Sequence, residues 1–170
     1  MEKLPQLYMR HPDLKQFCNF TVPVGFVIHT HSEGEESDWE NLVERAFGMH
    51  YSFDEFIRRK GEYNPDYVLY LLKNGKKIAT ATSTEIAKFP GEGWVRMVGT
   101  DPEYRGIGAG RLIVTAALSS LYKRGYKSAV LSTDDKRIGA IKLYMHLGFE
   151  PIFTHKSHKM RWEKIISELK

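Results

Sequence analysis

The stretch that decides the fold is Thr100-Asp101-Pro102-Glu103-Tyr104-Arg105-Gly106-Ile107-Gly108-Ala109-Gly110-Arg111. An apolar run over 94–98 precedes it, and the pattern of an amphipathic helix follows it. Glycines between a strand and a helix let backbone N–H groups close on an anion at the positive N-terminus of the helix. The stretch therefore predicts a binding site for a phosphate-bearing ligand.

Two common phosphate-binding motifs do not fit this stretch. The dinucleotide-binding pattern G-x-G-x-x-G needs glycine or alanine where this chain has Arg111. The P-loop needs a Gly-Lys-Ser/Thr run, and none follows here. The pattern [Q/R]-x-x-G-x-[G/A] does fit, with Arg105, Gly108 and Gly110 in its fixed positions.

A second motif lies about thirty residues downstream, with one strand pattern between the two. The run Ala140-Ile141-Lys142-Leu143-Tyr144-Met145-His146-Leu147-Gly148-Phe149 matches A-I-x-L-Y-x-x-L-G-F. Together the two motifs resemble the GNAT superfamily of acetyl-coenzyme A-dependent N-acetyltransferases over about residues 24–155. The run 98–102 also loosely resembles the mycothiol synthase branch of that superfamily.

The resemblance implies a mixed α/β fold. Its centre is a twisted, mostly antiparallel sheet, which is flanked by helices and contains one splayed pair of strands. The length of 170 residues suits one well-buried domain. We expect a single domain over 1–170, with an N-terminal arm (1–22), a core (24–155) and a C-terminal tail (156–170).

The apolar pattern along the chain agrees with this fold. Ser37 and Glu40 form the pattern of a capping box, and apolar residues at helical spacing follow it up to Gly48. A second box at Ser52 opens a short helix. The tail suggests a strand near Met160 and then a short helix. The other expected helices begin after the glycine loop and at 138, and the expected strands cover 26–30, 67–72, 77–87, 94–100, 127–132 and 149–154.

The resemblance implies that acetyl-coenzyme A is the co-substrate. The backbone N–H groups of Val98 and Thr100, on the splayed strand, would meet the pantetheine and the thioester, and Gly99 is a natural bulge residue. The family commonly has asparagine where this chain has Arg137, so that amide contact is lost, although arginine can contact a phosphate. The loop residues expected to bind the cofactor are Arg105, Gly106, Ile107, Gly108, Ala109, Gly110 and Arg111.

The same resemblance makes Tyr144 the partner of the leaving sulfur. A phenol with a pKa of about 10 is a weaker acid than a thiol with a pKa of about 8.5, so a hydrogen bond to the developing thiolate is favoured over full proton transfer. The acceptor amine must also lose a proton. The candidate bases are Glu85, Glu92, His155 and His158, and their spacing does not separate them.

Acceptor recognition in this family falls to the two helices near the N-terminus and their connection. That connection, residues 47–53, is rich in aromatic residues and could form an apolar wall or a groove for a peptide end. Arg96 lies on the strand before the glycine loop and would meet an acidic group if it faces inward.

Composition bounds the alternatives. The net charge of +4 suits a polyphosphate ligand. The sequence has no dense run of basic residues interleaved with aromatic residues, so it does not indicate nucleic-acid binding. His29 and His31 have no matching ligand cluster, so no metal is expected. The single cysteine, Cys18, and the absence of a membrane-spanning run or signal-peptide core favour the cytoplasm, with no membrane partner.

The sequence thus predicts an N-acetyltransferase that moves the acetyl group of acetyl-coenzyme A to a primary amine of an unidentified small molecule or peptide by direct attack in a ternary complex, as a monomer or homodimer. Another acyl group in place of acetyl remains an alternative. The main alternative is a catalytically silent domain that binds acetyl-coenzyme A as a sensor or scaffold. A basic nucleic-acid-binding domain is a third hypothesis.

Overall fold

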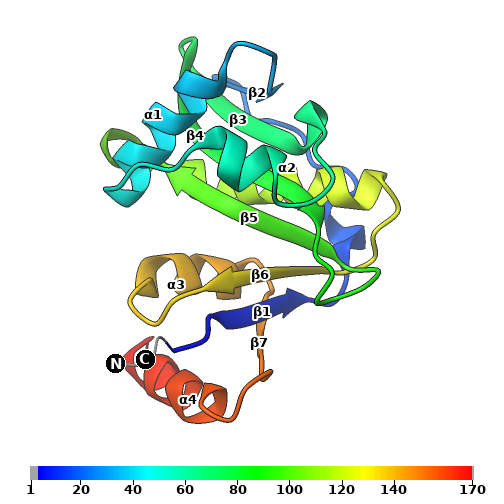
Figure 1. Ribbon diagram of the computed structural model, residues 1–170, viewed down its shortest axis with the longest axis vertical. Helices are drawn as coiled ribbons and strands as arrows, with labels where there is room; N and C mark the ends of the chain where they lie inside the picture. The colour runs from blue at the N-terminus through cyan, green and yellow to red at the C-terminus, as the bar shows by residue number, and fades with distance from the viewer. Residues whose placement is uncertain (1–3, 170) are drawn as a thin grey trace.

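The computed structural model describes residues 4–169, which build one seven-stranded sheet with helices on both faces (Figure 1). The strand order is β2-β3-β4-β5-β6-β1-β7, and every neighbouring pair is antiparallel except β5 and β6. This confirms the expected mixed α/β fold with its mostly antiparallel sheet. The strands are β1 (Leu7–His11), β2 (Phe26–Thr30), β3 (Val68–Lys73), β4 (Lys76–Glu85), β5 (Gly93–Thr100), β6 (Ala129–Thr133) and β7 (Glu150–Ile152). The helices are α1 (Glu36–Phe47), α2 (Ala109–Lys123), α3 (Ile138–His146) and α4 (His158–Leu169).

The hydrophobic core has two parts, one on each side of the sheet. The larger part joins α2 to the sheet and includes residues of α3, α4 and β1. The smaller part joins α1 and the helical turn Asp54–Arg58 to β3. Trp39, Leu42 and Val43 of α1 are fully buried there, as the helical spacing predicts. No helix within residues 4–169 combines the length and the hydropathy that crossing a bilayer requires.

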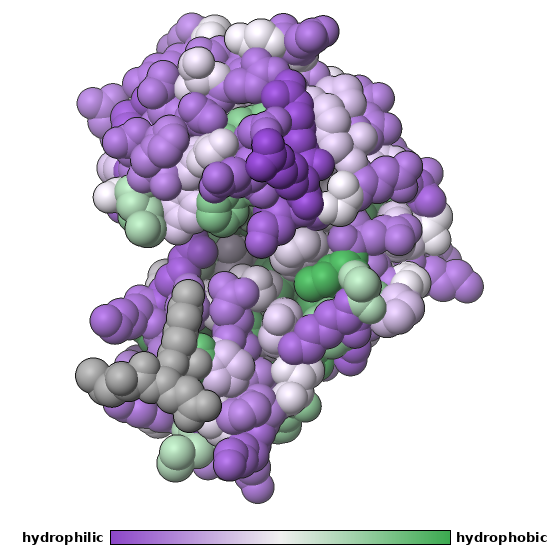
Figure 2. Space-filling model, viewed as in Figure 1, coloured by the Kyte–Doolittle hydropathy of each residue, from purple (hydrophilic) through white to green (hydrophobic). Residues whose placement is uncertain are grey.

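β5 and β6 form the splayed pair. They are paired only where Gly93–Val95 meets Ala129–Leu131, while β5 continues to Thr100. Figure 1 shows the two strands diverging toward their arrowheads, and Figure 2 shows the surface indented on that side of the molecule. The C-terminal half of β5 therefore has a strand neighbour on one side only.

β5 carries the expected bulge, but not at Gly99. Thr80 of β4 pairs with Gly99 and Thr82 pairs with Arg96, so two β5 residues stand opposite one β4 residue. Met97 lies in this irregular stretch with a φ of 50°. The prediction that Gly99 forms the bulge is wrong, because Gly99 is in regular register and its missing side chain instead makes room for α1.

The N-terminal segment, which the family resemblance did not explain, supplies an internal strand. β1 pairs along its whole length with β6, and Tyr8–Arg10 pairs with β7 on the other side. Leu7 and Met9 are fully buried. Figure 1 shows β1 lying between β6 and β7.

Two expected details at helix ends are wrong. The tail has no strand near Met160, because Trp162, Ile165 and Leu169 recur at helical spacing and pack on the core as part of α4. The capping box at Ser37 does not form either, since α1 begins at Glu36 and its N-cap residue is Glu35.

Candidate functional site

The glycine loop joins the end of β5 to α2. Asp101 directly follows the strand, and its side chain accepts a hydrogen bond from the Glu103 N–H at 3.1 Å, as expected of a turn residue. Gly106 and Gly108 have φ values of +82° and +86°, which favour glycine over residues with a Cβ. Both glycines are exposed and have open space where a Cβ would stand.

The start of α2 presents unpaired backbone donors. The Leu112 N–H makes the first hydrogen bond of this helix, to the Gly108 carbonyl at 3.0 Å. The N–H groups of Ala109, Gly110 and Arg111 therefore have no partner within the helix. Together with the positive end of the helix dipole, these groups have the arrangement that can bind an anion, and the side chains of Arg105 in the loop and of Arg111 in the first turn of α2 are exposed. Ile107 is 44% exposed, so its side chain is not part of the hydrophobic core.

The same helix end packs closely on β5 and α3. A Cβ on Gly110 would lie 3.2 Å from Leu143 Cδ2 and 3.5 Å from Thr100 Oγ1. Glycine at this position therefore brings α2, α3 and the end of β5 together at one point. This point is the open end of the splayed pair.

Backbone donors of β5 face the opening. The Asp101 N–H donates to the Ile78 carbonyl of β4 at 2.8 Å. Successive N–H groups of a regular antiparallel strand face opposite sides, so that of Thr100 faces the side of β6. Because β6 pairs with β5 only as far as Val95, neither Thr100 nor Val98 has a residue of β6 opposite it.

The C-terminal end of α1 lies across the same opening. Arg105 donates from Nη2 to the Ala46 carbonyl at 3.0 Å. The Arg137 guanidinium, at the start of α3, lies 5.1 Å from the centre of the Phe47 ring. Two of the three arginines expected at the cofactor, Arg105 and Arg137, thus contact the end of α1.

Tyr144 is buried on α3. Its ring meets the Phe149 ring edge-on, with the centroids 5.9 Å apart. Burial raises the pKa of the Tyr144 phenol, and the nearby positive charge of Arg137 opposes this rise only in part. The hydroxyl is therefore protonated at neutral pH and acts as a hydrogen-bond donor.

The structure does not bring the four candidate bases to the opening of the splayed strands. Glu85 is paired with Gly93, at the opposite end of β5 from Thr100, and it accepts a hydrogen bond from Tyr126. Glu92 lies at that same far end, in an ion pair with Arg10 at 2.7 Å.

The two histidine candidates follow β7. His155 is exposed, and its Nδ1 lies 2.9 Å from the Ser157 hydroxyl. His158 is fully buried in α4, and its Nδ1 accepts a hydrogen bond from the Thr154 N–H at 3.2 Å. Neither is in contact with the glycine loop.

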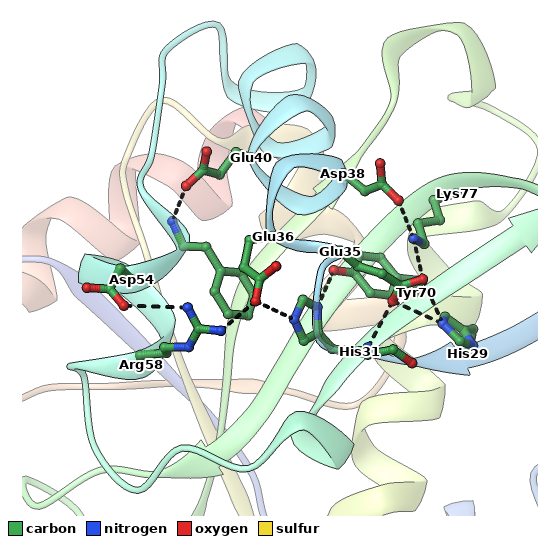
Figure 3. A network of polar contacts seen from close by, with 12 residues as sticks. His29, His31, Glu35, Glu36, Asp38, Glu40, Asp54, Arg58, Tyr70 and Lys77 are labelled. Atoms are coloured by element: carbon green, nitrogen blue, oxygen red, sulfur yellow. Dashed lines mark hydrogen bonds and ion pairs between the residues drawn. The ribbon is translucent and has the colours of Figure 1, made fainter.

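A polar network under the start of α1 was not predicted from the sequence (Figure 3). Glu35 accepts hydrogen bonds from Lys77 at 2.8 Å and from the Ser32 N–H at 2.9 Å. The buried His31 has its Nδ1 2.9 Å from the Tyr70 hydroxyl and stacks on Phe53. The network ties α1 to β2, β3 and β4. The only signal in the sequence was a run of acidic residues before α1 and a pair of lysines after the β3 turn.

The sheet is thus open between the parallel strands β5 and β6, and the start of α2, with its free N–H groups, lies at this opening. The model of the acetyltransferase (GNAT) family matches residues 35–149, which include both sequence motifs. The chain belongs to this family of N-acetyltransferases.

Individual relatives agree with this assignment. The chain is 31% identical over 153 residues to the mycothiol acetyltransferase of Thermobispora bispora, covering 83% of this chain and 52% of that protein. The chain thus spans about half the length of this curated relative.

Solved structures of the family share the fold. A GCN5-related N-acetyltransferase from Sphaerobacter thermophilus is 24% identical, has a TM-score of 0.68, and is matched over 86% of this chain and 48% of that one. Arabidopsis thaliana Naa50, in complex with the bisubstrate analogue CoA-Ac-MVNAL, is 19% identical with a TM-score of 0.65, over 79% of this chain and 89% of its own.

Proposed function

We propose that this protein transfers the acetyl group of acetyl-coenzyme A to a primary amine by direct attack in a ternary complex. The observation that carries the proposal is the open end of the splayed pair β5 and β6. There the start of α2, with its free N–H groups, lies beside the end of β5, whose residues Val98 and Thr100 have no β6 residue opposite them. Membership of the acetyltransferase family supports the reaction class.

In this proposal the pyrophosphate of the co-substrate lies on the glycine loop. The N–H groups of 109–111 donate to its oxygens, and the glycines at 106 and 108 leave room for close approach. Arg105 and Arg137 exchange their contacts with α1 for charge-assisted hydrogen bonds to phosphate. The Val98 and Thr100 N–H groups hold the pantetheine and polarise the thioester carbonyl.

The chemical step needs little from the side chains. The neutral amine attacks the thioester carbonyl carbon, the carbon–sulfur bond breaks, and the thiolate of coenzyme A leaves. The proton that the amine loses passes to water, and the thiolate takes up a proton from solvent. Tyr144 donates a hydrogen bond to the sulfur as its charge develops. Its raised pKa supports this role over full proton transfer, since the phenol is an even weaker acid than usual.

We do not infer the acceptor of this protein from the substrates of its relatives. This chain covers only 52% of that mycothiol acetyltransferase. We therefore propose only a primary amine here.

The melting temperature tests the proposal. It would be measured with saturating acetyl-coenzyme A, with coenzyme A, with NAD and without ligand. A ligand at 100 times its Kd adds about 2.7 kcal/mol, which raises Tm by roughly 5–10 °C for a domain of this size. A rise with both coenzyme A forms and not with NAD supports the proposal, and no rise with either contradicts it.

A panel of amines then separates an enzyme from a silent binding domain. Thiol release from acetyl-coenzyme A that depends on an added amine supports catalysis. Binding of coenzyme A without release for any amine favours the sensor or scaffold.

A further inference from the structure

Arg96 carries a buried charge with no acidic partner. Its side chain is 8% exposed and lies on β5, directly before the irregular residue Met97. The guanidinium donates from Nη1 to the Lys60 carbonyl at 3.3 Å and from Nη2 to the Phe56 carbonyl. It also lies 4.7 Å from the centre of the Trp94 ring. Within residues 4–169 no carboxylate forms an ion pair with it.

A buried cation without a counter-ion is costly, and proteins usually pair it. Burial alone lowers the pKa of Arg96 to about 10, so the group remains charged at neutral pH. A guanidinium has five N–H donors, and the two carbonyls use only part of them. The sequence led us to expect an acidic group near Arg96 if it faced inward. It faces inward, and the described chain supplies none.

The guanidinium borders a hollow of about 10 Å³ between β3, β4, β5 and the segment 57–67, which has room for one water-sized atom such as a single oxygen of an anion. The Thr82 hydroxyl lines the same hollow opposite Arg96, is 4% exposed and has no hydrogen-bond partner in the described structure. Thus two buried polar side chains with unused hydrogen-bonding capacity face one space. The remaining lining residues are Ile57, Lys60, Glu62, Tyr63, Asn64, Tyr67, Val68 and Thr84.

Aromatic contacts connect this hollow to the opening of the splayed strands. The Phe47 ring, which lies under Arg137, meets the Tyr51 ring edge-on with centroids 5.6 Å apart. Tyr51 in turn meets the Phe56 ring at 4.8 Å, and Arg96 donates to the Phe56 carbonyl. A series of ring contacts therefore leads from Arg137 through the expected acceptor segment, 47–53, to Phe56, which Arg96 contacts.

We propose that Arg96 and Thr82 bind an anionic group of the acceptor, so that the acceptor is a primary amine that also carries a carboxylate or phosphate. This inference rests on the proposed function. The structure also bounds the distance between the two groups. At about 3.3 Å per residue, Arg96 lies at most roughly 7 Å along β5 from Val98 and at most about 13 Å from Thr100, because the irregular residue Met97 lies between them. An α-amino acid is too short to reach both ends, so the anion is separated from the amine by several more bonds.

A ladder of unbranched amino acids tests both parts of the proposal. The acceptors are glycine, 4-aminobutanoate, 6-aminohexanoate and 8-aminooctanoate, each compared with the amino alcohol of equal length, and kcat/KM is measured by thiol release. We expect the acid to be preferred at least tenfold over its alcohol for the longer members and not for glycine. A further acceptor, 6-aminohexyl phosphate, is compared with 6-aminohexanoate to show whether phosphate or carboxylate is preferred. A preference for either anion over the alcohol supports the proposal.

Two variants test whether the preference for acids over alcohols depends on the side chains that line the hollow. Arg96→Gln should reduce the acid-to-alcohol ratio at least tenfold, and Thr82→Val, which keeps the side-chain shape, should reduce it about threefold. The control Arg10→Gln removes the same charge at the far end of β5, where Glu92 pairs with it, and should leave the ratio unchanged. The rise of Tm with coenzyme A shows that each variant is folded, and Thr82→Val carries the test if Arg96→Gln does not fold.

The outcomes separate this inference from the proposed function. Turnover with equal use of acids and alcohols, or a preference that survives both variants, overturns the role of Arg96 alone. Absence of turnover with every amine contradicts the proposed function and this inference with it.

Discussion

Gly99 of β5 lies directly against Ala46 of α1: a Cβ on Gly99 would stand 3.0 Å from the Ala46 Cβ and 3.6 Å from the Phe47 ring. This close approach puts the end of α1 at the opening of the splayed strands, where Arg105 and Arg137 contact it. The position of α1 and the shape of the site thus depend on one missing side chain.

Gly99→Val should force α1 away from the sheet. We expect the free energy of unfolding to fall by about 1–3 kcal/mol, as for other overpacked sites. Urea denaturation measures the loss, and a double-mutant cycle with Ala46→Gly checks its cause, since removing the opposing Cβ should recover part of it. Gly139→Ala is the control, because that helical glycine has open space around it. Additive effects of the two substitutions would contradict the contact.

Gly108→Ala should weaken coenzyme A binding specifically. The matched control is Gly125→Ala at the other end of α2, where φ is +95° against +86° at Gly108 and both positions have open space. Each change forces an alanine into the left-handed region and should cost about 1–2 kcal/mol of stability. Only Gly108 borders the free N–H groups, so we expect its variant alone to raise the Kd for coenzyme A, by about tenfold, or 1.4 kcal/mol. Equal Kd values in the two variants would remove the loop from the binding site.

Tyr144→Phe should lower kcat without affecting binding. A hydrogen bond to a charged group is worth about 2 kcal/mol, which corresponds to roughly 30-fold in rate. The KM for acetyl-coenzyme A and the urea midpoint should stay near those of the natural protein, because the ring packing against Phe149 is kept. Tyr122→Phe, a half-buried tyrosine of α2, is the control. Turnover that is unchanged in Tyr144→Phe would exclude this side chain from the mechanism.

Local patterns in the sequence predicted most elements of the fold, because amphipathic spacing and glycine positions act over a few residues. The glycine loop and the helix after it follow from such patterns, whereas the splay of β5 was expected only from the family resemblance. The place of β1 does not, since pairing with β6 joins residues more than a hundred positions apart and leaves no local trace. The prediction of a bulge at Gly99 was wrong for a similar reason. Glycine is required there because α1, which is far away in the sequence, packs directly against it.

The candidate site was predictable only in part. The cofactor loop is contiguous, so its residues could be named from the motif. The candidate bases are spread along the chain, and the sequence did not reveal that Glu85 and Glu92 lie at the far end of β5. The solitary charge of Arg96 depends on the path of segment 56–60 above it, which only the folded structure reveals.

Acid should destabilise the protein from about pH 6.5 downward. Burial lowers the pKa of His31, His11 and His158 in the folded state. Between the lowered pKa of the folded state and the ordinary pKa of the unfolded state, the unfolded chain binds more protons than the folded protein. The stabilisation is therefore fully present above the ordinary histidine pKa and is lost as the pH falls from that value to the folded-state pKa. Each histidine contributes at most about 1.4 kcal/mol per pH unit.

Urea denaturation at pH 7.5, 6.5 and 5.5 measures this slope. His31→Asn should flatten it, while a substitution of the exposed His146 should not. At still lower pH a second loss is expected from Glu35. Burial raises its pKa, but hydrogen bonds from Lys77, Ser32 and His29 outweigh this and hold it at about 2, so its contribution disappears between about pH 4.5 and 2. A slope between pH 7.5 and 5.5 that is identical in His31→Asn would contradict the role of His31.

Met9→Ala tests whether β1 is part of the core, and Met160→Ala is its matched control. Met9 is fully buried between β6 and β7, whereas Met160 is 70% exposed on α4. Removing a buried methionine leaves a cavity and should cost about 2–5 kcal/mol, while the exposed one should change stability by less than about 0.5 kcal/mol. Because β1 also supports Phe149 through His11, whose ring meets it edge-on with centroids 5.4 Å apart, the Met9 variant should in addition loosen the packing of Tyr144. Near-UV circular dichroism and urea denaturation follow the two effects, and equal stability of the two alanine variants would mean that residues 7–11 form a dispensable arm.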